Sequence, residues 1–326
     1  MHISRISTWA LTASAAALAL TMTGCTGEPS AAQAGEGGDV IQVATLRQPH
    51  LFAPYVYQDF APEGMTIEVV PMTDSTAIKN AVVNGDVEFG VLGVPSVLAG
   101  ISQDEDIKLV ASAADGGTGI VGDADISGVK DLKGKKVGYV PGSSQEILLR
   151  QTLAQAGMDA DTDVELVNIG FADMPDALER GDIDAFSSAE VGPSIAILDG
   201  AHSIVSPYET PIGKVNIGLA TTGKLIADDP GLVQDIVDTH IRATNRLLAD
   251  RDAWADGIQA NFSFDDDVLA QALKNIWLRS RIGDDYQAQV GELAEHMLEL
   301  GTLEKLPDAA KTFDTTFIDA TAEEAS

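Results

Sequence analysis

Residues 131–157 have the sequence DLKGKKVGYVPGSSQEILLRQTLAQAG, and this stretch decides the fold. An apolar, strand-like run at 136–140 is followed by a turn at 141–142 and a predicted helix at 143–156. Gly157 ends the helix, because glycine readily adopts the left-handed conformation found at helix ends. A strand that passes through a tight turn into a helix is typical of α/β proteins.

The same alternation extends along the chain on both sides of this stretch. Strands are predicted at 40–46, 65–70, 87–94, 107–112, 164–169, 183–187, 203–205 and 215–221, with helices between them at 50–60, 74–84, 95–100, 174–179 and 194–198. After residue 221 the pattern becomes helical, with one helix starting at Asp229 and another at 265–267 that carries Leu269, Leu273, Ile276 and Trp277. We therefore predict an α/β protein of two similar lobes with largely parallel sheets, and C-terminal helices packed on one lobe.

The composition excludes several classes of function. The 326 residues include 50 Asp and Glu against 20 Lys and Arg, a net charge of −30, which disfavours binding to nucleic acid. A single cysteine allows no internal disulfide and no cysteine-based metal site. The histidines lie far apart without metal-ligand spacing, so we expect neither a metal nor another cofactor.

The first 39 residues predict where the protein resides. One arginine, Arg5, precedes an apolar run at 9–20 and the sequence MTGC at 22–25, which resembles a bacterial lipobox. We predict a lipoprotein signal peptide at 1–24, a lipid such as palmitate on Cys25, and a flexible Gly- and Ala-rich tether over 25–39. The protein would then be anchored on the extracytoplasmic face of the cell membrane. An ordinary secretory signal with an incidental cysteine is the alternative.

Two literal motif matches fail on their context. Residues 117–122 fit GxGxxG, but no helix pattern follows and no acid stands about 20 residues on to hold a ribose. The run 123–128 begins like a calcium loop but has Gly134 where a bidentate glutamate is required. No nucleophile motif is present either, so we predict a protein that is not an enzyme.

The strongest local signal is GSSQE at 142–146, where the predicted strand gives way to a helix. Ser143 and Glu146 have capping-box spacing, and a helix start offers free N–H groups to an anion. Ser143 alone would suffice for capping, whereas the adjacent Gly142 and the second hydroxyl of Ser144 favour a binding role. Similar strand-end turns lie at 47–50, 93–96 and 189–194, and such turns meet at one edge of a sheet.

Three stretches carry a family resemblance: 131–157, ALERGDIDAF at 177–186 and NGDVEFGVLGVPSVLAG at 84–100. Over residues 40–315 the chain resembles the solute-binding proteins of ABC importers, in the nitrate/sulfonate/taurine family. The resemblance implies a periplasmic-binding-protein type II fold, with two lobes of mixed sheet flanked by helices and a two-strand hinge. Lobe 1 would comprise 40–120 and 214–326 and lobe 2 would comprise 121–213, with hinge crossings near 119–123 and 210–215.

The resemblance also implies a ligand pocket. Its residues here would be Gln48, His50, Val94, Pro95, Ser96, Gly117, Thr118, Ser143, Ser144, Gln145 and Glu190. The family often has Trp-Glu-Pro where this chain has AEV at 189–191, so the aromatic wall expected from that tryptophan is missing.

The charges near this pocket constrain the ligand. Arg47 is one cation and His50 a second candidate, so we expect the amides and hydroxyls at Ser143 and Ser144 to hold an anionic group. Glu190, if it faces the cleft, would suit a zwitterion or an amine; otherwise it is a surface or hinge residue.

The resemblance implies a lipid-anchored, monomeric binding component that delivers a small anionic or zwitterionic solute to an ABC permease and its ATPase subunits. Aliphatic sulfonates or taurine are the first candidates, and nitrate, bicarbonate, a pyrimidine or another vitamin precursor stay open. A ligand sensor for a membrane signalling partner and an enzyme on the same fold are alternatives from other classes.

Overall fold

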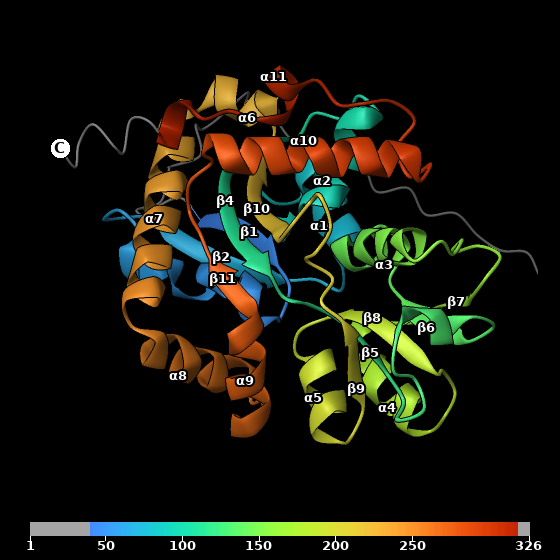
Figure 1. Cartoon of the computed structure of the whole chain (residues 1–326). Helices are drawn as coiled ribbons and strands as arrows, with labels where there is room; N and C mark the ends of the chain where they lie inside the picture. The colour runs from blue at the N-terminus through green and yellow to red at the C-terminus, as the bar shows by residue number, and fades with distance from the viewer. Residues whose placement is uncertain (1–39, 319–326) are drawn as a thin grey trace, which may run out of the picture. The chain divides into compact units, whose positions relative to one another are not determined.

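Two mixed β-sheets organise the chain, and Figure 1 shows them with their flanking helices. The computed structural model describes residues 40–318, which lie within one compact unit. The sheets share no strand, and each has helices packed against it. The α/β class predicted from the alternation of strands and helices is confirmed.

The six-stranded sheet has the order β11-β4-β10-β3-β1-β2. Its strands are β1 (Val40–Thr45), β2 (Thr66–Pro71), β3 (Phe89–Gly93), β4 (Lys108–Gly116), β10 (Val215–Thr221) and β11 (Ile276–Leu278). β1 pairs in parallel with β2 and β3, while β10 pairs antiparallel with β3 and β4. The carboxyl ends of β1, β2 and β3 therefore lie at one edge of this sheet.

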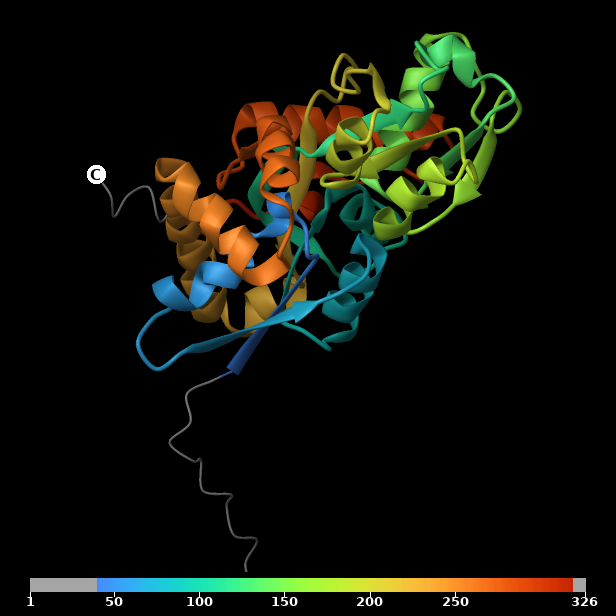
Figure 2. The ribbon, with the colours of Figure 1, turned by 90° about the horizontal axis from the view of Figure 1, so that it is seen from below.

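The five-stranded sheet has the order β7-β6-β8-β5-β9. Its strands are β5 (Thr118–Gly122), β6 (Lys136–Tyr139), β7 (Glu165–Asn168), β8 (Ala185–Ala189) and β9 (His202–Val205). β6 pairs in parallel with β7 and β8, and β5 pairs antiparallel with β8 and β9. Figure 2 shows this green-to-yellow part of the chain as a body of its own beside the six-stranded sheet.

Helices cover both sheets. They are α1 (Ser75–Asn84), α2 (Val94–Ser102), α3 (Ser144–Gln155), α4 (Met174–Glu179), α5 (Gly192–Leu198), α6 (Gly223–Asp228), α7 (Pro230–Ala249), α8 (Arg251–Phe262), α9 (Asp266–Ala272), α10 (Asp284–Glu299) and α11 (Ala309–Thr312), with 3₁₀ turns η1 (Pro49–Leu51), η2 (Ala53–Phe60), η3 (Val129–Leu132), η4 (Phe171–Asp173) and η5 (Leu273–Asn275). The Asp74 carboxylate caps α1 by accepting from the Ala77 amide at 2.8 Å, and Gly85 ends it at φ +75°. These are the signals that the sequence displays at both ends of this helix.

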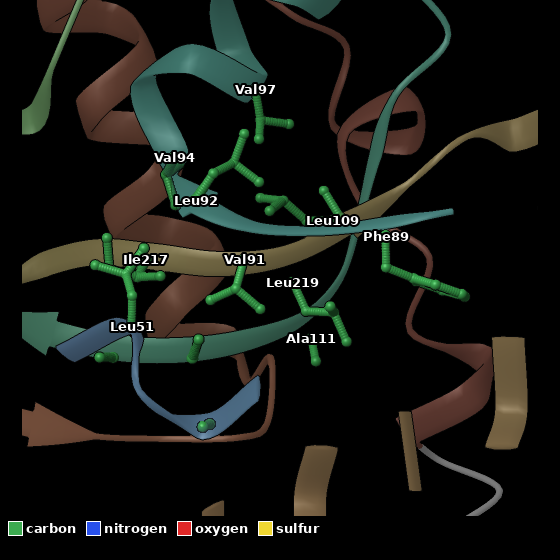
Figure 3. Packing of buried hydrophobic residues seen from close by; sticks show 14 of the residues in the cluster. Leu51, Phe89, Val91, Leu92, Val94, Val97, Leu109, Ala111, Ile217 and Leu219 are labelled. Atoms are coloured by element: carbon green, nitrogen blue, oxygen red, sulfur yellow. The ribbon is translucent and has the colours of Figure 1, made fainter. Parts of the chain in front are cut away.

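The main hydrophobic core lies between the six-stranded sheet and its helices. Figure 3 shows side chains from β3, α2, β4 and β10 meeting there, among them Phe89, Val91, Leu109 and Leu219. All four are fully buried. Helix α7 adds the apolar stripe that includes Val233 and Ile236, and helices α7 and α10 contact this sheet.

One predicted element is wrong. Ile276 and Trp277, expected to continue a helix, form β11 and pair antiparallel with β4. Their spacing fits a helix, but the free edge of β4 supplies hydrogen-bond partners that end α9 after Ala272. Residues 118–122 form strand β5 inside the second sheet, and the hinge crossing near 119–123 stays a prediction.

The chain passes between the sheets twice. The first passage lies at Gly117, between β4 and β5, and the return lies between β9 and β10, at 206–214. The exact lobe boundaries given above stay a prediction.

The predicted signal peptide, Cys25 and the tether lie outside the described residues. Within 40–318, no helix combines the length and the apolar character needed to cross a membrane.

Candidate functional site

A cleft lies where the carboxyl ends of the parallel strands of both sheets face each other. The segments that follow β1, β2 and β3 line it from the six-stranded sheet, and those that follow β6, β7 and β8 line it from the five-stranded sheet. Ligands of open α/β sheets bind at such strand ends. The sequence-based expectation that strand-end turns would face one another therefore agrees with the geometry.

One part of the cleft, which we call the polar cavity, has an empty volume of about 370 Å³ including its opening to solvent. Its lining includes small polar side chains at helix starts, and consists of Leu46, Gln48, His50, Leu51, Asp74, Ser75, Thr76, Gly93, Ser96, Val140, Pro141, Gly142, Ser143, Ser144, Gln145, Phe171, Asn216 and Ile217. Three helix N-termini, of α1, α2 and α3, contribute to it. Each presents the positive end of a helix dipole, which favours a negative charge in the space between them.

The start of α3 is held by its own hydrogen bonds. Ser143 Oγ donates to the Val140 carbonyl oxygen at 2.6 Å and accepts from the Glu146 amide at 3.2 Å. The Glu146 carboxylate accepts from the Gly142 amide at 2.7 Å. In a standard capping box it would accept from the amide of the N-cap residue, Ser143, one residue later. The Ser143 hydroxyl therefore uses its hydrogen and one lone pair in holding the turn and the helix start.

Two buried polar atoms in the polar cavity have no partner. Ser144 Oγ and His50 Nδ1 make no hydrogen bond, although Ser144 is 4% and His50 2% exposed. An unpaired buried polar group costs free energy, so a ligand that pairs with it binds more tightly. Burial lowers the pKa of His50 to about 3, so its imidazole is neutral near neutral pH. His50 thus contributes no positive charge to the cleft.

Hydrogen bonds connect the two sides of the cleft. Ser96 Oγ, on α2, donates to the carbonyl oxygen of Gly142 at 3.3 Å. Asn275 Nδ2, just before β11, donates to Glu190 Oε1 at 3.0 Å and to the carbonyl oxygen of Thr118 at 2.9 Å. Within the five-stranded side, Gln145 Nε2 donates to Thr118 Oγ1 at 3.0 Å and so fixes the side chain next to Ser144.

A second part of the cleft, the apolar cavity, has an empty volume of about 1170 Å³ including its open mouth. Most of its lining side chains are apolar, and the full set is Leu46, Arg47, Gln48, Met72, Thr73, Gly170, Phe171, Ala172, Pro175, Ala189, Glu190, Val191, Gly192, Ile195 and Phe264. Phe171 lines both cavities and supplies an aromatic wall. The family resemblance places an aromatic wall at 189–191, where this chain has no aromatic residue, so Phe171 supplies an aromatic side chain from a different segment.

The two ionisable side chains of the apolar cavity already have partners. Arg47 Nη2 donates to the Asn261 carbonyl oxygen at 2.7 Å, and its guanidinium lies 5.4 Å from the centre of the Phe262 ring. The Glu190 carboxylate is 4% exposed and accepts from Ser194 Oγ at 2.7 Å as well as from Asn275. Burial raises the pKa of Glu190, while the hydrogen bonds from Ser194 and Asn275 lower it.

The structure brings most of the predicted pocket residues together. Gln48, His50, Ser96, Ser143, Ser144 and Gln145 line the polar cavity, and Glu190 lines the apolar cavity. Gly117 lies against the His50 ring, where an added Cβ would come within 2.9 Å of Nδ1. Thr118 faces a separate cavity behind Glu190. Val94 and Pro95 are buried at the start of α2 and line neither part of the cleft.

Several lining residues were missed in the sequence. Asp74, Ser75 and Thr76 follow β2. The rule that ligands bind at turns after parallel strands, which we call the strand-end rule, selected the other turns and would also have found these residues. Phe171 and Asn216 carry no sequence signal, because their positions depend on how the two sheets are placed. Within residues 40–318 no three His, Cys, Asp or Glu side chains are placed to share a metal ion.

Known proteins resemble this chain in sequence. The profile of the family described as NMT1/THI5 like matches residues 52–253. A Bacillus subtilis (strain 168) protein, provisionally named aliphatic sulfonates-binding protein, is 27% identical over 273 residues, which cover 82% of each chain.

Solved structures share the fold. The alkanesulfonate-binding protein SsuA of Xanthomonas axonopodis pv. citri, bound to MOPS, superposes with a TM-score of 0.74 at 18% identity, over 84% of this chain and 98% of that chain. The periplasmic nitrate-binding protein NrtA of Synechocystis PCC 6803 has a TM-score of 0.73 at 12% identity, over 88% and 89%. The periplasmic binding protein fold expected from the sequence is confirmed.

Proposed function

Because this chain belongs to the NMT1/THI5-like family, we propose that it is the substrate-binding component of an ABC importer and captures a small organic anion of the sulfonate class. The solute would bind in the cleft and be delivered to a permease and its ATPase subunits. The proposal includes the lipid anchor on Cys25, a monomeric binding body, and closure of the two lobes about the segments at 117 and 206–214.

The observation that carries the proposal is the unpartnered hydroxyl of Ser144 beside the N-terminus of α3. A sulfonate has three acceptor oxygens and one negative charge, which match the hydroxyl, the first amides of α3 and the N–H of a neutral His50. Neutral donors hold an anion without the desolvation cost of a second buried charge. The names of the relatives, which refer to sulfonates and nitrate, support the anion class.

A thermal-shift screen tests the proposal. The purified protein would be heated with alkanesulfonates, taurine, nitrate, bicarbonate and hydroxymethylpyrimidine. A sulfonate present at 100 times its Kd stabilises the folded state by about 2.7 kcal/mol, which raises the Tm by roughly 4 °C for a chain of this size. A shift with nitrate, bicarbonate or the pyrimidine alone would transfer the assignment to that ligand.

The variant Ser144→Ala separates binding at α3 from binding elsewhere. We expect at least a tenfold rise in Kd by calorimetry, because the lost hydroxyl is replaced by no other donor. The Tm without ligand should not fall, since Ser144 Oγ is buried without a partner in the folded protein and its removal breaks no hydrogen bond. Unchanged affinity in Ser144→Ala would contradict the proposed site.

A further inference from the structure

The first passage between the two sheets is held by hydrogen bonds from several segments. Gly117, the single residue between β4 and β5, donates its amide to the Asn275 carbonyl oxygen at 2.8 Å and accepts from the Glu190 amide at 2.9 Å. One residue earlier, the Gly116 amide donates at 2.8 Å to the carbonyl oxygen of Lys214, in the return passage. The first passage is therefore bonded both to the return passage and to Asn275, which lies in neither passage.

The segment 275–277 also contacts the return passage. Its backbone belongs to the six-stranded sheet, since Ile276 begins β11. Trp277 meets the ring of Tyr208 nearly at right angles, with the ring centres 5.9 Å apart, and the Lys214 ammonium lies 3.4 Å from the centre of the Trp277 ring. These contacts hold the return passage against the six-stranded sheet.

The Asn275 side chain reaches from the six-stranded side to the five-stranded side. Its Nδ2 donates to the carbonyl oxygen of Thr118, which begins β5, at 2.9 Å and to Oε1 of Glu190, which follows β8, at 3.0 Å. The Tyr208 hydroxyl holds Thr118 as well, because it accepts from the Thr118 amide at 2.9 Å and donates to the Thr118 carbonyl oxygen at 3.0 Å. Asn275 lines neither the polar nor the apolar cavity, so it acts on a ligand there only through the placement of the two sides.

The carboxylate of Glu190 makes this contact strong. Glu190 is 4% exposed, and its Oε2 accepts from Ser194 Oγ at 2.7 Å, so Asn275 supplies the donor for the other oxygen. A hydrogen bond to a charged group is worth more than one between neutral groups, and a buried oxygen that loses its donor is costly. The lysines of the adjoining cavity, Lys214 and Lys274, contact an aromatic ring and a glutamine instead.

We propose that Asn275 is a positioning residue for ligand capture, whose amide joins Thr118 and Glu190 to the six-stranded side and so holds the two sides facing each other across the cleft. This inference rests on the proposed function, since the residues that line the polar cavity come from both sides and meet one ligand only in that arrangement. When only a fraction of the molecules has the binding arrangement, the apparent Kd rises by the inverse of that fraction. Loss of the Asn275 amide should therefore weaken every ligand of the cleft by one common factor.

Distances between the two sides, measured without ligand, test the inference directly. The substitutions Leu198→Cys on α5 and Leu248→Cys on α7, at side chains that are 50% and 45% exposed, would carry spin labels in the full chain with Cys25→Ser. Pulsed electron paramagnetic resonance should give a broader distribution with a longer mean distance in Asn275→Ala. Asn261→Ala is the matched control, because the Asn261 amide donates within its own helix, and it should leave the distribution unchanged. An unchanged distribution in Asn275→Ala would overturn the inference.

Calorimetry with ethanesulfonate and hexane-1-sulfonate tests the link to capture. Asn275→Ala should raise the Kd of both probes roughly threefold or more, by factors that agree within about twofold, whereas Asn261→Ala should leave both Kd values unchanged. A loss for one probe only would mean that Asn275 acts on the ligand itself, and a lower Tm with unchanged Kd values would mean a merely structural role; either result overturns the inference. If neither probe binds the wild-type protein, the proposed function fails, while the distances still decide whether Asn275 holds the two sides.

The variant Asn275→Asp gives a readout that lost packing would not produce. Its carboxylate would lie against that of Glu190, and two such groups repel each other unless they share a proton. We expect a broad distance distribution at about pH 8 that narrows toward that of the wild type at about pH 5, with a smaller change in the wild type. This comparison of one protein with itself decides the question even where Asn275→Ala does not fold, and equal distributions at both pH values would overturn the inference.

Discussion

Hydrogen-bond partners give two adjacent serines different roles. Ser143 uses its hydroxyl twice, toward Val140 and Glu146, and so holds the start of α3. Ser144 has the same functional group one residue later, yet its hydroxyl has no hydrogen-bond partner, and the residue lines the polar cavity. A helix cap needs only one side chain, so the second hydroxyl is available for a ligand.

A buried histidine makes stability depend on pH. His240 Nδ1 accepts from the Tyr57 hydroxyl at 2.5 Å, and Nε2 donates to the Ser112 carbonyl oxygen at 2.7 Å, so both nitrogens are used by the neutral ring. Burial lowers the pKa of His240 from 6.5 to about 4. As pH falls below about 6.5 the unfolded chain takes up the proton first, so folding stability decreases until pH reaches about 4.

Replacing this histidine should reduce the acid sensitivity. Between about pH 7 and about pH 4.5 we expect His240 to account for a loss of about 2 kcal/mol in the free energy of unfolding. His240→Gln keeps one donor and one acceptor and should remove that part of the loss, as measured by urea unfolding at both pH values. His202→Gln, at an exposed histidine, should keep the full loss. Identical pH profiles for wild type and His240→Gln would contradict the assignment.

At the scale of elements, the edge of β4 determines where a helix ends. Gly116, at φ +76°, lets β4 approach the segment before β11 so closely that an added Cβ would lie 2.5 Å from the Asn275 carbonyl oxygen. The Gly117 amide donates to that same oxygen at 2.8 Å. This close approach brings Ile276–Leu278 onto β4 as a strand, although their spacing favours a helix.

A pair of glycine variants tests this contact. Gly116→Ala introduces both a left-handed alanine and a collision with backbone, whereas Gly134→Ala has a similar φ of +73° with nothing within 4 Å of the added Cβ. We expect Gly134→Ala to cost about 1 kcal/mol of unfolding free energy, and Gly116→Ala about 3 kcal/mol or more. Urea unfolding of the two variants measures the difference. Equal losses would mean that the β4–β11 contact adjusts without cost.

At the scale of the whole molecule, the arrangement of two sheets creates a site that neither sheet has alone. The ends of six parallel strands face one cleft, and the hydrogen bonds of Ser96 and Asn275 cross it. Closure of such a cleft on a ligand requires the connecting segments to move while the cores stay intact. The five-stranded sheet has hydrophobic clusters of its own, while Ile147 and Leu148 of α3 belong to the main cluster, so apolar packing also joins the two sides.

The anchor at Cys25 is a prediction for the whole molecule in its host cell. Cys25→Ser should abolish incorporation of labelled palmitate and move the protein from the membrane fraction to the soluble fraction, because no other lipid site is proposed. Met22→Leu, which brings the sequence closer to the usual lipobox, should leave anchoring intact. Wild-type protein that carries no label would contradict the lipoprotein assignment.

Local signals in the sequence sufficed to determine the class of fold and much of the site. Asp74 and Gly85 mark the ends of α1, GSSQE marks the start of α3, and the strand-end rule selects segments that do line the cleft. These features depend on neighbours within a few residues, so the sequence alone displays them. The family resemblance, which also rests on local sequence, pointed to Gln48, His50 and Glu190, and these residues line the cleft.

Only the tertiary structure decided the features that depend on distant segments. It placed Ile276 and Trp277 on the edge of β4, brought Phe171 between the two cavities, and buried His50 so that its imidazole is neutral. The same holds for Ser143 and Ser144, whose roles separate only when their partners are known. A residue's burial and its hydrogen-bond partners come from elements far away in the chain, and no local pattern encodes them.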